Sequence, residues 1–180
     1  MTAVRLRAAF VAASIAWAVL LVAVPFAASQ PHVSAMAAAV IAGVYTVGSL
    51  VCHQLPERSY HLWAAQMPVC ARCAGIYFGA VLGAIERTLA MTRRGRPWSA
   101  RSRSTWLLGP SKLRPYDIDF NNAWTARIVL ALAAVPTVVS LVYEWTTGDT
   151  PSHAIRAAAG VPIGVAVAWL IVAATDNQVN

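Results

Sequence analysis

Residues 70–85 read CARCAGIYFGAVLGAI, and this stretch joins the two features that organise the chain. It opens with a Cys-x-x-Cys pair, Cys70 and Cys73, and continues as an uninterrupted apolar run. Three glycines recur along it at intervals of four residues: Gly75, Gly79 and Gly83. Residues four apart share one face of a helix, and glycines there let a neighbouring backbone come close. The stretch therefore predicts a tightly packed helix that carries two thiols at its start.

This helix is one of five apolar runs in the 180-residue chain, whose composition is 58% hydrophobic and only 12% charged. Soluble domains carry about 25% charged residues, so much of this surface is expected to face lipid. Each run approaches the roughly 20 residues that a helix needs to cross a bilayer. The runs cover residues 10–28, 33–51, 74–91, 126–145 and 155–174. We therefore predict an all-α, polytopic transmembrane helix bundle of about five spans, with the lipid bilayer as its partner.

Stripes of small residues, like the one in residues 70–85, occur in two other runs. They are Ala35, Ala39 and Gly43 in the second run, and Gly160, Gly164 and Ala168 in the fifth. They predict close helix packing at these faces as well.

The runs divide the chain into four parts. The first helix, within residues 1–30, follows Arg5 and Arg7. Its apolar run exceeds the core of about 7–15 residues that a cleaved signal has, so we expect a retained helix or signal anchor. Residues 31–91 hold the second and third helices with the cysteine motif, residues 92–125 form a basic polar loop, and residues 126–180 hold the last two helices. The richness in arginine and alanine suggests a bacterial genome, and we expect the protein in the bacterial cytoplasmic membrane.

The basic loop bears on orientation. It carries seven cations before its first acid, Asp117, which is typical of a cytoplasmic loop under the positive-inside rule. Anionic lipid and nucleic acid are alternative partners, but the loop lacks the fold signature of a nucleic-acid-binding module, so we predict no nucleic acid. With five spans, however, this loop lies on the opposite side from Arg5 and Arg7. The charges then disagree about which side is cytoplasmic.

Cysteines and histidines gather around the connection between the second and third helices. Cys52 and His53 end the second helix, His61 lies in the connection, and Cys70 and Cys73 begin the third helix. With five spans, the connection between the fourth and fifth helices lies at the same membrane face. It would add three supporting polar residues: Glu144, His153 and Arg156. The sequence therefore predicts a Cys/His cluster at one end of the bundle.

The motif CHQLPERS over residues 52–59, followed by CARCAGIYFG over residues 70–79, resembles the domain of unknown function 2085 (DUF2085) family, small predicted membrane proteins of prokaryotes. The resemblance is weaker over the last two helices. There the family pattern has Asp-Gly, then Ser-Asn and an arginine, where this chain has Glu144-Trp145, then Ser152-His153 and Arg156. The resemblance implies a membrane protein but no activity, so function must be argued from the site.

The first hypothesis for the cluster is a metal site that holds an ion such as zinc. Zinc takes four ligands from cysteine and histidine, and Cys-x-x-Cys supplies two from one turn. We predict three thiolates and one imidazole from a set of candidates: Cys52, His53, His61, Cys70 and Cys73. Copper is compatible with soft thiolates. An iron–sulfur cluster is disfavoured because the chain has only three cysteines.

The second hypothesis is thiol–disulfide chemistry by Cys70 and Cys73, with Arg72 adding positive charge between them. A helix N-terminus stabilises a thiolate, which is the reactive form. Two further alternatives stay open: cysteines that only pack, and a small transporter in which Glu144 and Arg156 line a polar path. The sequence carries no nucleotide-binding, nuclease or hydrolase signature, so it does not decide whether the protein is an enzyme.

Overall fold

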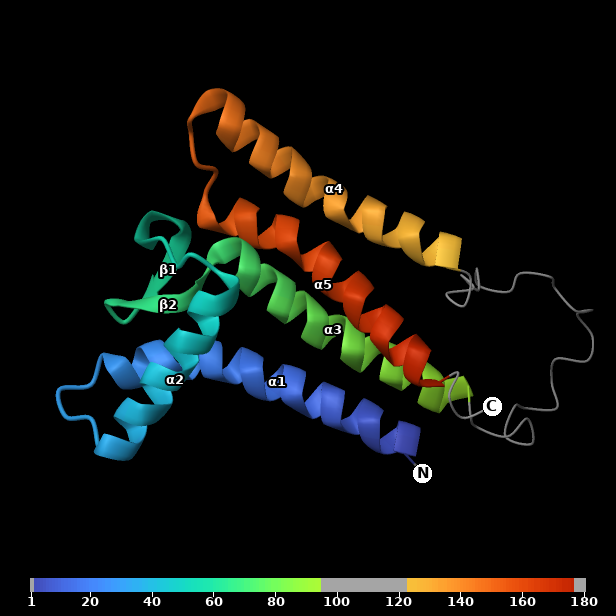
Figure 1. Cartoon of the computed structure of the whole chain (residues 1–180), viewed down its shortest axis with the longest axis horizontal. Coiled ribbons are helices and arrows are strands. Elements are labelled where there is room, and N and C mark those ends of the chain that lie inside the picture. The colour runs from blue at the N-terminus through green and yellow to red at the C-terminus, as the bar shows by residue number, and fades with distance from the viewer. Residues whose placement is uncertain (1, 95–122, 177–180) are drawn as a thin grey trace, which may run out of the picture.

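The structure, a computed structural model, describes residues 2–94 and 123–176 (Figure 1). Four long helices make up the bundle: α1 (Thr2–Ala28), α3 (Ala71–Arg94), α4 (Ala123–Thr147) and α5 (His153–Asp176). Each is long and apolar enough to cross a membrane, and each leaves large apolar side chains exposed, as lipid contact requires. The predicted all-α, polytopic bundle is confirmed. The predicted basic loop, residues 92–125, lies mostly outside the described residues.

The second apolar run forms a shorter helix, α2 (Ala35–Val51), of 17 residues. The Ser34 hydroxyl caps its start by accepting a hydrogen bond from the Ala37 N–H at 3.3 Å. A helix of this length covers about 26 Å, which is short of the roughly 30 Å hydrocarbon core. Figure 1 shows α2 lying across the end of α1 instead of running back along it. We infer that the described chain crosses the bilayer four times.

Four crossings change how the charges are distributed. In Figure 1 the start of α1, the end of α3, the start of α4 and the end of α5 lie at one end of the bundle. The opposite end holds α2, the connection to α3 and the turn between α4 and α5, as the sequence predicted for these two connections. Arg5 and Arg7, at the start of α1, therefore share an end of the bundle with Arg93 and Arg94 at the end of α3. With five spans, the two groups of cations disagreed about which side of the membrane is cytoplasmic. With four spans they lie on the same side, so the positive-inside rule gives one answer.

A small hairpin, which the sequence did not predict, connects α2 to α3. It comprises a 3-10 turn, η1 (Pro56–Arg58), and the antiparallel strands β1 (Ser59–Leu62) and β2 (Ala65–Cys70). Its register pairs Ser59 with Cys70 and Leu62 with Ala65. The two turn residues, Trp63 and Ala64, have φ angles of 51° and 64°, the left-handed conformation that two-residue hairpin turns require.

Hydrogen bonds from Gln54 hold the hairpin against α2. The side-chain Nε2 of Gln54 donates to the carbonyl oxygens of Tyr45 at 2.8 Å and Pro68 at 2.7 Å. The Tyr45 hydroxyl in turn donates to the carbonyl oxygen of Gln66. These contacts bring β2 next to the end of α2. Cys70, at the end of β2, therefore lies near Cys52, which ends α2.

Glycines set the closest helix contact, which is between α3 and α5. A Cβ added at Gly79 would lie 2.3 Å from the Val161 carbonyl oxygen, and one at Gly164 would lie 1.9 Å from the Ile76 carbonyl oxygen. The packing predicted for these two stripes is confirmed. The prediction is wrong at Gly43 in α2, where an added Cβ meets nothing within 4 Å among the described residues.

We expect Gly79→Ala to lower the free energy of unfolding by about 1–3 kcal/mol, since the new methyl group must push two backbones apart. Gly43→Ala is the matched control and is expected to be neutral or slightly stabilising, because alanine is the better helix former. Denaturant unfolding in detergent measures both. Equal effects of the two substitutions would contradict the close approach of α3 and α5.

Candidate functional site

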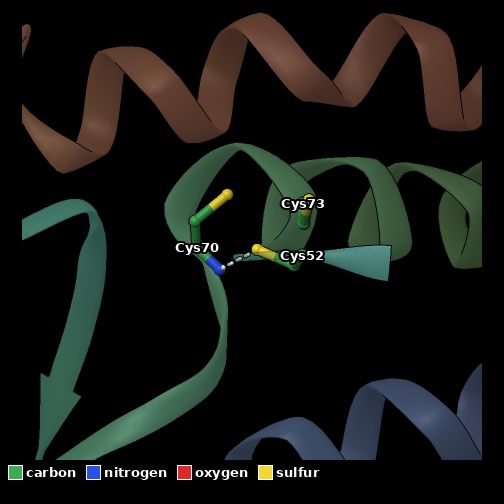
Figure 2. A group of neighbouring side chains, drawn as sticks. All are labelled: Cys52, Cys70 and Cys73. Atoms are coloured by element: carbon green, nitrogen blue, oxygen red, sulfur yellow. Dashed lines mark hydrogen bonds between the residues drawn. The ribbon is translucent and has the colours of Figure 1, made fainter. Parts of the chain in front are cut away.

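Three thiols converge at the start of α3 (Figure 2). The sulfur atoms of Cys52, Cys70 and Cys73 all lie within 4.8 Å of one another, and all three cysteines are free. Cys52 is buried, and its sulfur accepts a hydrogen bond from the Cys70 backbone N–H at 3.2 Å. The three residues come from the end of α2, the end of β2 and the first turn of α3. The hairpin therefore assembles the cluster from sequence positions up to 21 residues apart.

Local backbone geometry orients the thiols. Cys52 ends α2 in an extended conformation, with φ −145° and ψ 134°. Cys70 directly precedes α3, where the first N–H groups of the helix have no partner within it. The Cys73 thiol and the Cys73 and Arg72 N–H groups donate to the Cys70 sulfur and, against the opposing effect of burial, lower the pKa of Cys70 to about 5. This hydrogen bonding favours the thiolate form of Cys70.

The structure does not bring the histidines into the thiol cluster. Among the described residues, the converging group of possible metal ligands contains the three cysteines and no imidazole. His53 and His61 are both exposed. His153 instead packs against Tyr60, with ring centroids 5.3 Å apart. The role of His53 and His61 as metal ligands stays a prediction. Both side chains would have to turn away from solvent to reach an ion held by the thiols.

A buried carboxylate surrounded by three arginines forms a second polar group at the same end of the bundle. Arg72 Nη2 donates to Glu144 Oε1 at 2.7 Å and to the Ser140 hydroxyl at 2.8 Å. Arg156 Nε lies 3.5 Å from Glu144 Oε1, and Arg58 Nη1 lies 3.9 Å from Oε2. We call Glu144 and these three arginines the arginine cluster. It adjoins the thiols, because Arg72 lies between two of the cysteines in sequence and Arg156 interacts electrostatically with Cys70.

The arginine cluster brings together two polar residues that were expected at this face and one that was not. Glu144 and Arg156 were expected at this face and do form an ion pair. Arg58 was not among the expected site residues, although it reaches Glu144 from the hairpin. Its sequence neighbour Glu57, an apparent partner, is exposed. The signal available in the sequence was charge balance: a buried arginine needs a counter-charge, and an acid in a membrane helix pairs with a cation.

One known protein family matches most of the chain. A family described as "Predicted membrane protein (DUF2085)" matches residues 52–170. The chain belongs to the DUF2085 family. The match begins at the first of the three cysteines and ends within α5, so it includes both polar groups, whereas α1 and α2 precede it.

Two archaeal relatives match shorter segments. An uncharacterised protein of Methanocaldococcus jannaschii is 52% identical over 42 residues, which are 23% of this chain and 27% of the relative. An uncharacterised protein of Methanothermobacter thermautotrophicus is 50% identical over 30 residues, 17% of this chain and 27% of the relative. The chain therefore spans about a quarter of the length of each of these relatives. No solved structure matches the chain.

We expect Glu144→Gln to lower the free energy of unfolding by about 3–5 kcal/mol, because it leaves buried guanidinium groups without their counter-charge. Glu57→Gln removes the same charge from an exposed position and is expected to have little effect. Denaturant unfolding of the two variants in detergent makes the comparison. A loss for Glu144→Gln no larger than that for Glu57→Gln would show that the carboxylate does not hold the arginines in place.

Proposed function

We propose that this membrane protein binds a thiophilic metal ion, such as zinc, through Cys52, Cys70 and Cys73. The observation that carries the proposal is the convergence of three free thiols within 4.8 Å. Thiolates that bind one zinc ion at about 2.3 Å in a tetrahedron lie about 3.8 Å apart, so small side-chain movements bring these sulfurs to a common ion. Such an ion ties α2, β2 and α3 together.

The surrounding charge supports a metal–thiolate centre. Three thiolates around a divalent ion leave one net negative charge, which is costly to bury without a counter-charge. Arg156 is buried and interacts electrostatically with Cys70. Its positive charge favours both the deprotonated ligands and the anionic centre that they form.

Three protein ligands leave a fourth position on zinc. An open fourth position is characteristic of zinc sites that bind water or an external ligand. His53 and His61 stay candidates for that position if their side chains turn inward. Copper(I) is the alternative ion, because soft thiolates select it.

Metal analysis of the purified protein tests the proposal. We expect about one metal ion per chain in the parent protein, and loss of that ion in Cys52→Ser, Cys70→Ser and Cys73→Ser. His53→Ala and His61→Ala are measured alongside, and loss of metal in either one identifies the fourth ligand. A metal-free parent protein, or serine variants that retain the metal, would refute the proposal.

Thiol–disulfide exchange is the second candidate function, favoured by the position of Cys70 at the start of α3, next to Cys73. In this reaction the Cys70 thiolate attacks a disulfide of a partner protein, forming a mixed disulfide and releasing one partner thiolate. Cys73, after losing its proton, then attacks the mixed disulfide, which leaves a Cys70–Cys73 disulfide here and a reduced partner. Metal-free parent protein with an oxidisable Cys70–Cys73 pair would favour this candidate over metal binding.

Topology bears on both candidates, and we propose that the thiols face outward from the bacterial cytoplasmic membrane. Helical spans suit that membrane, since bacterial outer-membrane proteins are mainly β-barrels. The positive-inside rule supports the orientation, because Arg5, Arg7, Arg93 and Arg94 all belong to the opposite end of the bundle. The outward orientation suits thiol exchange in an oxidising compartment, and it makes external metal accessible.

We expect a membrane-impermeant thiol reagent to label Glu57→Cys in intact cells and to label Arg5→Cys only after lysis. Both positions are exposed and lie at opposite ends of the bundle. Peptide mass spectrometry at the substituted position separates this labelling from that of the native thiols. The reverse pattern would invert the orientation, and labelling of both positions at the same side would contradict four spans.

A further inference from the structure

The arginine cluster carries more positive charge than its own carboxylate neutralises. Three guanidinium groups, from Arg58, Arg72 and Arg156, surround the single carboxylate of Glu144, which leaves a net charge of +2. Burial is deepest for Arg156, whose side chain is 2% exposed, and for Arg72, which is 11% exposed. Concentrated, partly desolvated positive charge of this kind is unfavourable unless an anion joins it.

Hydrogen-bonding groups in the cluster also lack partners. Within the described part of the chain, five buried side-chain atoms of the cluster have no hydrogen-bond partner: four donors, Nε of Arg58, Nε of Arg72, and Nε and Nη1 of Arg156, and one acceptor, Oε2 of Glu144. Guanidinium nitrogens only donate, so the missing partner must be an acceptor. Glu144 cannot fill every gap, since its Oε1 already accepts from Arg72 and its Oε2 is a single free oxygen facing four unpartnered donors. An unpaired buried donor costs about 1–3 kcal/mol, and four in one place therefore point to an acceptor of external origin.

The surroundings add to the positive potential and provide access. The N-termini of α3 and α5 lie at this end of the bundle, and helix N-termini favour anions. Arg58 is 39% exposed and opens the cluster to solvent. On the membrane side, an apolar groove of about 590 Å³ runs between α4 and α5 and reaches the cluster at Ser140, whose hydroxyl accepts from Arg72.

We propose that Arg58, Arg72 and Arg156 form a binding site for a phosphate-type oxyanion. Arginine matches the planar arrangement of oxygens in such groups with pairs of parallel hydrogen bonds. Two sources share this chemistry, free phosphate from solution and the phosphate of an anionic lipid headgroup. The groove beside Ser140 is suited to an acyl chain of the lipid. The proposal rests on the arginine cluster and does not require a metal at the thiols, although charge at the thiols changes the electrostatic potential at Arg156.

Two measurements on the full-length protein test the site and identify the source. The first follows the melting temperature of protein in neutral detergent as inorganic phosphate is added, with chloride at matched ionic strength as the control for screening. The second compares the melting temperature in phosphatidylcholine vesicles with and without phosphatidylglycerol. A rise with phosphate identifies free anion as a ligand, and a rise confined to phosphatidylglycerol identifies the lipid headgroup.

Arg58→Gln is the decisive variant, because its side chain lies outside the long helices and is partly exposed, so the fold tolerates its loss. We expect it to weaken the observed binding at least about tenfold, as loss of a charge-assisted hydrogen bond does. Arg127→Gln removes one positive charge from an exposed position near the start of α4 and is expected to change nothing. No response to either ligand, or equal weakening by the two variants, would overturn the site. Arg156→Gln adds a deeper test wherever that variant folds.

Discussion

The backbones of α3 and α5 touch because glycines remove the side chains that would hold them apart, and much of the site depends on this contact. A Cβ at Gly160 would lie 2.3 Å from the carbonyl oxygen of Arg72. Arg156 precedes Gly160 by one helical turn on the same side of α5. The contact that brings the helices together therefore also brings the two arginines together. Lipid tails are as apolar as the helices, so there is no hydrophobic driving force for helix association in the membrane. Close van der Waals packing of this kind provides the attraction instead.

The requirement to neutralise buried charge then determines how α4 joins the bundle. Arg72 and Arg156 are held side by side by helix packing, and their repulsion must be offset. Glu144, on α4, offsets this repulsion and accepts a hydrogen bond from Arg72. The hydroxyl of Ser140, four residues earlier, also accepts from Arg72. A further link, from the Thr137 hydroxyl to the Ala159 carbonyl oxygen at 2.7 Å, continues the seam between α4 and α5. The seam is polar at this end of the bundle, where Glu144 meets Arg72 and Arg156.

The thiol cluster is assembled differently, from an extended segment between two helices. Cys73 lies on α3, but Cys52 reaches it only because α2 ends there and the hairpin returns the chain to the start of α3. Side-chain hydrogen bonds of Gln54 and Tyr45 hold that return path. The thiols and the arginine cluster thus share α3 as a common support, with Arg72 between two cysteines. Any ion or anion bound at one group alters the electrostatic potential at the other.

Sequence alone determined the features that depend on local composition and periodicity. Apolar runs predict membrane helices because the backbone must satisfy its own hydrogen bonds in lipid. The glycine spacing in α3 and α5 predicts close helix packing because helical periodicity places those residues on one face, but it does not say which helices meet. The convergence of Cys52 with Cys70 and Cys73 was a reasonable prediction because the three residues flank one connection. The pairing of Arg58 with Glu144 was not, since it joins residues 86 positions apart through two helix contacts.

Two features could be learned from the folded chain alone: α2 lies across the end of α1, and the histidines stay apart from the thiols. The hydropathy of α2 resembles that of a membrane-spanning helix. The orientation of α2 instead follows from its hydrogen bonds to the hairpin that comes after it. Spacing in sequence places His53 beside Cys52, but an extended backbone turns consecutive side chains to opposite sides, so the histidine faces solvent while the cysteine is buried. Both outcomes come from the path of a short segment whose conformation is set by long-range hydrogen bonds and not by its own composition.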